Sequence, residues 1–333
     1  MPNFLTRIDP LVAGIIVSAL IAFVLPARGA FADGFSVAVK LAIALLFFLY
    51  GARLSTREAL NGLTHWRLHA AILACTFVVY PLIGILLRPL SAVVSPELYQ
   101  GILFLTLVPS TVQSSVALTG IARGNVSGAV VAASLSSLVG VVATPLLAMP
   151  VMRSSGGVLI DASVFLDISI QLLLPFLLGQ LAHNFLPPVR EIAASKATKI
   201  IAASKATKIV DRGSIWMVVY SAFSQGVVAG MWTQLPLWQI LFLIVLAAAL
   251  VVAMLWVTGW VPGKLGFNRA DTVAIQQCGT QKSLATGLPM ASVMFGGATL
   301  GTLIIPLMIY HMTQLVICSS YVSRYAGADE SQH

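Results

Sequence analysis

Long apolar runs follow one another along this chain from end to end, and they constrain its fold more than any other feature. Ten runs of roughly 18 to 25 mostly apolar residues can be distinguished among the 333 residues. An α-helix of that length covers about 30 Å, the thickness of the hydrocarbon core of a bilayer. Each run therefore predicts a membrane-spanning helix, and the ten spans cover residues 10–27, 35–54, 68–90, 98–121, 126–150, 163–186, 213–233, 237–260, 271–295 and 299–322.

Composition agrees with an all-α integral membrane protein. The chain is 58% hydrophobic and 9% charged, whereas about a quarter of the residues of a soluble domain carry charge. Arg7, the apolar run after it and the Ala-Phe-Ala triplet at 30–32 are also the layout of a cleaved secretory signal. We favour a span, because the run is long for a signal and its removal would leave nine spans.

The basic residues predict the orientation of the chain in the membrane. Fourteen Lys and Arg fall on the side of the termini and the even-numbered loops, and three, Arg28, Arg88 and Arg153, fall on the other. Because cytoplasmic loops carry the excess of Lys and Arg, both termini are predicted to lie in the cytoplasm, with the protein in the plasma membrane (the inner membrane of a bacterium). The net charge of +8 follows from this topology and from attraction to anionic lipid, so no nucleic-acid partner is expected.

A tandem duplication lies in the longest cytoplasmic connection. The nine residues IAASKATKI occur at 192–200 and again at 201–209. We expect the copy to lengthen a basic amphipathic helix along the membrane surface. No chemistry is assigned to it, and its origin is left open.

A second repeat relates the two halves of the chain. QSSVALTG at 113–120 and QKSLATG at 281–287 share Gln, Ser, Ala, Thr and Gly in the same order, 168 residues apart. Five spans per half is an odd number, so the second half would cross the membrane in the opposite sense. Inverted repeats with polar segments at matching places are typical of secondary transporters. We predict inverted repeats at 1–154 and 155–333.

Both repeat segments predict a broken helix. Pro109 removes a main-chain donor within the fourth span, beside a cluster of hydroxyl and amide side chains, and glycines and glutamines surround Lys282 in the ninth. Main-chain groups freed at such breaks must face protein or a wet cavity rather than lipid. Helix packing through small residues is the alternative for the hydroxyl cluster. The substrate-binding residues predicted from the two segments are Pro109, Thr111, Gln113, Ser115, Gln281 and Lys282.

Lys282 is the most unusual residue of these segments. It lies eleven residues beyond Asp271, so in a continuous helix it would sit roughly 16 Å below the surface, beyond the reach of a lysine side chain of about 6 Å. A lysine in lipid costs at least about 2.5 kcal/mol, and no carboxylate occupies the centre of any span. Two interpretations stay open: the ammonium couples to substrate or ion, or it caps the carbonyls of a broken helix.

VPSTVQSSVALTGIARGN in the first half and QQCGTQKSLATG in the second carry a resemblance. Over nearly its whole length the sequence resembles the bile acid:sodium symporter superfamily, in particular the branch that includes vertebrate sodium/bile acid cotransporter 7. The resemblance implies a panel of spans 1, 2, 6 and 7 and a core of spans 3–5 and 8–10, in which broken spans 4 and 9 cross. It also implies an organic-anion substrate, commonly coupled to sodium.

The family's sodium-ligand positions match only in part. Gln277 stands where better-studied members have glutamate, Ala129 and Ala133 where they have hydroxyls, and Lys282 where they have a neutral amide. The predicted site is therefore about two charges more positive than in those members, which disfavours the binding of two sodium ions. One sodium near Ser114, a proton carried by Lys282, and passive transport are left open. The sodium site that the resemblance implies would be drawn from Thr76, Ser114, Ser115, Gln277, Thr280 and Gln281.

We expect a transporter rather than an enzyme. No nucleophile with a base, and no carboxylate pair, shares a depth in the predicted spans, and no phosphate-binding glycine loop occurs. His183 and His311 are expected to be hydrogen-bonded packing residues, and the three cysteines lie at no metal-ligand spacing. The prediction is a secondary transporter that moves a small organic anion by alternating access, without a cofactor apart from sodium. A channel and a regulatory membrane protein are the alternatives.

Overall fold

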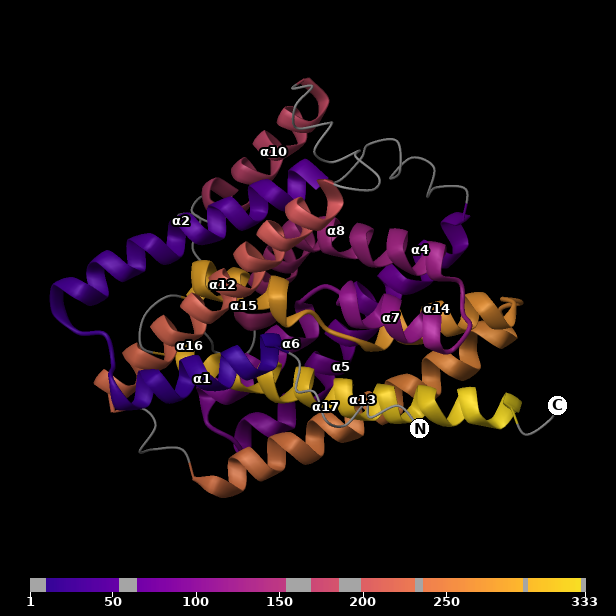
Figure 1. Ribbon diagram of the computed structural model, residues 1–333. Helices are drawn as coiled ribbons and strands as arrows, with labels where there is room; N and C mark the ends of the chain where they lie inside the picture. Colours follow the sequence, from indigo (N-terminus) through magenta and orange to yellow (C-terminus); the bar gives the residue numbers. More distant parts are fainter. Residues whose placement is uncertain are drawn as a thin grey trace. The chain divides into compact units, whose positions relative to one another are not determined.

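The computed structural model of the protein describes residues 10–53, 65–153, 169–185, 199–230, 236–295 and 299–330. Within these ranges every regular element is a helix (Figure 1). The prediction of an all-α membrane protein is confirmed. Two apolar helices of the described ranges, Ala13–Val24 and Ile170–Ala182, are short, and five are long and apolar enough to cross a membrane: Gly29–Leu49, Trp66–Leu86, Val126–Met152, Leu237–Lys264 and Leu300–Val322.

The chain divides into two compact units, each assembled from three separate stretches. The first unit comprises residues 1–54, 162–234 and 288–302, and the second comprises residues 55–161, 235–287 and 303–333. Helices from predicted spans 1, 2, 6 and 7 fall in the first unit, together with residues 288–302, which the prediction groups with the core. The compact units differ from the sequence halves, and the two inverted repeats stay a prediction.

Paired helices make up the first unit. Helix α1 (Pro10–Val24) packs against α12 (Lys199–Val228), and α2 (Gly29–Arg53) packs against α10 (Leu174–Phe185) (Figure 1). A π-helical turn, η5 (Ser169–Leu173), leads into α10. The unit also receives the end of α15 (Leu284–Phe295) and most of α16 (Leu300–Leu303).

Glycines bring α2 and α10 into close contact. A Cβ added to Gly51 would meet the main chain of Phe176, and one added to Gly179 would meet the main chain of Phe48. Small residues permit this approach between membrane helices, where packing rather than the hydrophobic effect holds helices together. The contact is reciprocal, because each helix supplies one glycine and one stretch of exposed main chain.

Two expectations for the first unit differ from the structure. Helix α2 begins at Gly29 rather than at residue 35, so the Ala-Phe-Ala triplet belongs to a helix. The second copy of the duplicated segment, 201–209, is part of α12 rather than of a separate surface helix. Its Ala, Ile and Lys residues sustain a helix, so α12 continues from Lys199 into the predicted seventh span. The first copy lies outside the described residues apart from its last two.

The second unit holds the long helices α8 (Val126–Arg153), α13 (Leu237–Lys264) and α17 (Ile305–Glu330). Helices α13 and α17 run side by side (Figure 1). Three short elements follow α4 (Trp66–Ala74): a π-helical turn η3 (Cys75–Val79), α5 (Tyr80–Leu86) and the 3-10 turn η4 (Arg88–Ala92). An apolar cluster joins α4, α8 and the ninth span, and it consists of Leu68, Ile72, Ala129, Ala132, Ala133, Ala274, Ile275 and Cys278.

Both predicted helix breaks are present in the second unit. The fourth span consists of α6 (Pro96–Leu107) and α7 (Gln113–Ile121). The ninth begins with α14 (Arg269–Thr280), and three residues separate α14 from α15. A residue before proline is driven to the extended region. Val108, which precedes Pro109, accordingly has φ −75° and ψ 153° and ends α6. Gln281 ends α14 in the same conformation, with φ −86° and ψ 142°.

Candidate functional site

The two helix breaks contact each other through main-chain and hydroxyl groups. The amide of Ser283 donates to the carbonyl of Pro109 at 2.8 Å. The hydroxyl of Ser110 donates to the carbonyl of Cys278 at 2.5 Å, and that of Thr111 donates to the carbonyl of Lys282 at 2.6 Å. Broken helices leave main-chain groups without helical partners. Here each break satisfies groups of the other, so the two segments form one polar centre.

Lys282 is fully buried in this centre. Its Nζ donates to the main-chain carbonyls of Thr76 at 3.1 Å, Thr106 at 3.2 Å and Val108 at 2.9 Å. The same atom lies 4.0 Å from the centre of the Tyr80 ring, within the range of a cation–π contact. The side chain therefore donates to one carbonyl of the turn between α4 and α5 and to two carbonyls at the end of α6.

Two local features free these carbonyls. In the π-helical turn η3 the amide of Tyr80 donates to the carbonyl of Cys75, five residues back. The next bond in that register would run from residue 81 to the carbonyl of Thr76, but residue 81 is proline and has no N–H. In α6, Thr106 would receive the amide of Ser110, which donates instead to the hydroxyl of Ser136 at 3.1 Å. Lys282 supplies the missing donor to both.

The main chain at Lys282 is held by α17. Its amide donates to Oε1 of Gln314 at 2.7 Å, and its carbonyl accepts Nε2 of Gln314 at 2.9 Å. His311 Nδ1 lies 2.9 Å from the same Nε2, which agrees with its expected role as a hydrogen-bonded packing residue. The hydroxyls of Tyr80 and Tyr310 donate to the carbonyl of Thr280 at 2.6 and 2.9 Å, which closes the end of α14.

A second group of polar side chains lies at the ninth-span break. Ser114 Oγ donates to Oε1 of Gln281 at 2.5 Å, and Nε2 of Gln281 donates to Oε1 of Gln277 at 3.2 Å. Gln277 is fully buried, and its Nε2 has no hydrogen-bond partner among the described residues. Buried amides without a partner are rare. We name Ser114, Gln277 and Gln281 the amide cluster.

The structure separates the other predicted site residues. Gln113 is exposed at the start of α7, and the ring of Pro109 is buried against α8. The hydroxyls of Ser115 and Thr76 donate to carbonyls one turn earlier in their own helices, those of Thr111 and Ile72. The hydroxyl of Thr280 lies 3.2 Å from that of Thr258 on α13. The hydrogen bonds of these three hydroxyls thus go to groups outside the amide cluster.

Two further observations bear on the sodium ligands that the resemblance implies. Ala129 and Ala133, at the positions where family members have hydroxyls, pack in the apolar cluster with Cys278. The Lys282 ammonium, in turn, contacts carbonyls at the carboxyl end of α6. That end carries the negative pole of the helix dipole, which attracts a cation.

Sequence patterns missed several residues of this centre. The hydrogen-bond acceptors of the Lys282 ammonium on η3 and α6 are main-chain carbonyls, which no side-chain pattern can reveal. Tyr80 and Tyr310 have no unusual spacing. His311 and Gln314 carry the one usable signal, since residues three apart share a face of a helix and polar pairs are rare in apolar spans.

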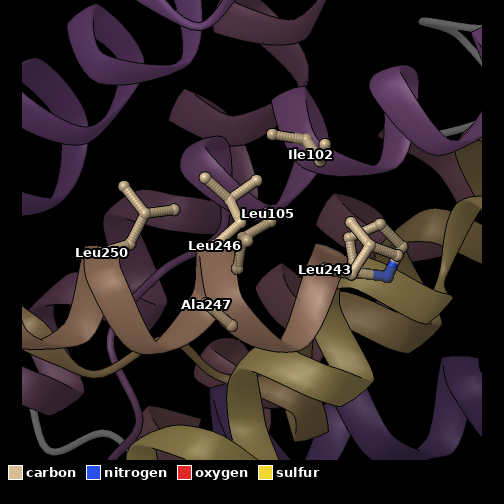
Figure 2. A pocket seen from close by; sticks show the side chains of 7 residues that line it. Ile102, Leu105, Leu243, Leu246, Ala247 and Leu250 are labelled. Carbon is tan, nitrogen blue, oxygen red and sulfur yellow. The ribbon is translucent and has the colours of Figure 1, made fainter. Parts of the chain in front are cut away.

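A recess in the second unit lies apart from the polar centre. It is a small recess between α6, α13 and the start of α17 (Figure 2). Its lining is apolar and consists of Ile102, Leu105, Leu243, Leu246, Ala247, Leu250 and Pro306. No lining group could orient a polar solute, so this recess is not the candidate site.

Interrupted helices that meet at buried polar breaks in an apolar helical protein define a class, that of membrane transport proteins. The comparisons agree with this class. The family model described as the SBF-like CPA transporter family matches residues 9–327, and the chain belongs to this family.

Relatives in bacteria and animals cover nearly the same length. The chain is 42% identical to uncharacterised protein PA2026 of Pseudomonas aeruginosa, over 98% of this chain and 94% of the relative. It is 40% identical to "Putative symporter YfeH" of Escherichia coli, over 97% and 94% of the two chains. Identity to sodium/bile acid cotransporter 7 of Danio rerio is 29%, over 84% and 81%. The protein is thus a transport protein rather than an enzyme.

Proposed function

We propose that the protein is a secondary active transporter that moves a small organic anion across the membrane by alternating access. The observation that carries the proposal is the contact between the two helix breaks, where main-chain groups of α6–α7 and α14–α15 are paired across the centre of the second unit. Solute sites of secondary transporters lie at such discontinuous helices. The names of the relatives support symport, and bile acids are organic anions.

The site residues divide into two roles in this proposal. Gln113, Ser114 and Gln281 contact the solute or the coupling ion, because Gln113 is exposed and Ser114 is half-buried beside Gln281. Pro109, Thr111, Ser115 and Lys282 hold the breaks in place, since their polar atoms are already bonded within the centre.

Sodium is the coupling ion that we propose, bound once rather than twice. The amide cluster offers oxygen atoms from Ser114, Gln277 and Gln281, and the orphaned amide of Gln277 supports a rotation that would turn its oxygen toward an ion. Thr76 and Thr280 are left out of this proposed site, because their hydroxyls bond elsewhere.

The arrangement in the membrane belongs to the same proposal. The first unit would act as the panel and the second as the moving core, with the two sequence halves as inverted repeats. The excess of basic residues supports cytoplasmic termini, and the bacterial relatives support an inner-membrane location.

Uptake by proteoliposomes tests the proposal. Purified protein would be reconstituted and supplied with a panel of radiolabelled organic anions, with an inward gradient of sodium, of potassium or of protons. We expect saturable, sodium-stimulated uptake of at least one anion, abolished by Gln281→Ala and preserved by Gln225→Ala, which removes a half-buried glutamine elsewhere in the chain. Uptake driven by protons alone would show that the coupling ion is the proton rather than sodium. Single-channel current that does not saturate would show that the protein is a pore rather than a carrier.

A further inference from the structure

The ammonium group of Lys282 has a complete set of partners. A lysine ammonium has three N–H donors, and Nζ has three carbonyl partners at 2.9 to 3.2 Å, which are ordinary N–H···O lengths. The face of the Tyr80 ring closes a further side. We call the carbonyls of Thr76, Thr106 and Val108 together with this ring the carbonyl site.

The acceptors of the carbonyl site do not depend on the lysine for their position. Pro81 removes the amide that the π-helical register would give to Thr76, and Ser136 holds the amide of Ser110 away from Thr106. Val108 is extended because Pro109 follows it. Three inward carbonyls would therefore remain in this place, without helical donors, if the lysine side chain were shorter.

Such a group of carbonyls is suited to a monovalent cation. Main-chain carbonyls coordinate monovalent ions in channel filters, the carboxyl end of α6 adds the negative pole of its dipole, and an aromatic face attracts cations. We propose that the carbonyl site is a binding site for a primary ammonium ion, that Lys282 is its tethered occupant, and that a free ammonium ion binds there when the side chain is shortened.

This site is distinct from the amide cluster of the proposed function. A cation fixed to the chain bridges η3, α6 and the ninth-span break, so the junction of the two breaks holds together without a free ion. Because Lys282 already fills the carbonyl site, free ammonium ions should add no stability to the native protein through this site, whether or not sodium binds at the amide cluster.

Thermal unfolding of purified Lys282→Ala in detergent tests the inference. Melting temperatures would be compared in choline, sodium, potassium, ammonium and methylammonium chloride at equal ionic strength. We expect the variant to melt several degrees below the native protein in choline. Ammonium and methylammonium should raise its melting temperature with the saturation of a single site. The native protein should gain no more stability from ammonium or methylammonium than from potassium.

Two controls isolate the site. Lys282→Met keeps the unbranched stem, which fills the space and leaves no room for a free ion, so no rescue is expected. Lys264→Ala removes an exposed lysine that also lies over an aromatic ring, that of Trp260, and it should leave the salt response at the native level.

Several outcomes would overturn the inference. The first is an ammonium effect on the melting temperature of Lys282→Met or of the native protein that equals the effect on Lys282→Ala. The second is a rise in the melting temperature of Lys282→Ala in sodium chloride without a rise in ammonium chloride. The third is a Lys282→Ala chain that stays unfolded in every salt. In the last case a free cation would have failed to replace the tethered one. Since no transport is measured, failure here is separable from failure of the proposed function.

Discussion

The hydroxyl of Thr111 donates a 2.6 Å hydrogen bond to the main-chain carbonyl of Lys282, 171 residues further along the chain. A side chain from one interrupted helix thereby satisfies the main chain of the other. The same carbonyl accepts from Gln314, so three elements of the second unit depend on one oxygen atom.

Loss of the Thr111 hydroxyl should weaken this junction. Thr111→Val keeps the shape of the side chain and removes the donor, and we expect a loss of about 1–3 kcal/mol in the free energy of unfolding, measured by denaturant titration in detergent. Thr302→Val is the matched control, because the Thr302 hydroxyl is buried without a partner among the described residues. If Thr302→Val lowers the free energy of unfolding as much as Thr111→Val does, the hydrogen bond from Thr111 to Lys282 does not stabilise the junction.

A carboxylate in the amide cluster should strengthen sodium binding. Gln277→Glu adds a negative charge beside Gln281, and cations prefer negative oxygen ligands. We expect sodium to raise the melting temperature of this variant more than potassium does, and more than sodium raises that of the native protein. Gln239→Glu, which places the same charge at a buried glutamine of α13, should show no such preference. Equal increases in the melting temperature of Gln277→Glu in sodium and in potassium would contradict the proposed sodium site.

The hydrogen bond between Asn125 and Asp271 in the second unit should be weakened by an added negative charge. Asn125 Nδ2 donates to Oδ1 of Asp271 at 2.7 Å, while Oδ1 of Asn125 accepts the amide of Gly128 at the start of α8. Asn125→Asp keeps the helix cap but places a second carboxylate against Asp271. We expect a lower melting temperature that partly recovers as salt screens the repulsion. Ser91→Asp adds the same charge at an exposed serine of η4 whose hydroxyl bonds the carbonyl of Arg88, and its melting temperature should stay close to the native value.

The glycine contact of the first unit should tolerate no side chain. Gly51→Val would drive its side chain into the main chain of Phe176, and we expect loss of the monodisperse peak in size-exclusion chromatography. Gly213→Ala serves as the control, since nothing lies within 4 Å of its Cβ, and replacing a helical glycine should leave stability unchanged or raise it by up to about 1 kcal/mol. Recovery of Gly51→Val with native stability would mean that α2 and α10 are not in direct contact.

Features with a local cause could be predicted from the sequence. Pro109 ends α6 through its own ring and its effect on Val108, whatever surrounds it. The burial of Lys282 followed from its distance along an apolar span. In both cases the physical cause lies in the neighbouring residues of the sequence, so the amino-acid pattern was sufficient for the prediction.

The direction of the Lys282 side chain had a distant cause. Its partner Thr76 lies 206 residues away, and that carbonyl is available only because a π-helical turn and Pro81 coincide within an ordinary apolar run. Hydroxyls presented a related difficulty. Ser and Thr in apolar helices often bond a carbonyl one turn back, as Ser115 and Thr76 do, and composition does not distinguish these from hydroxyls that face a ligand. The sodium ligands therefore stay a prediction.

The continuity of α12 has a geometric consequence for the duplicated segment. Nine helical residues advance about 13.5 Å and rotate the chain by about two and a half turns. Nine residues inserted into an unbroken helix therefore leave a half-turn offset, so the residue that precedes them lies on the opposite face of the helix from the one it would occupy without the insertion. The residues of α12 that follow the second copy and pack on α1 keep their register.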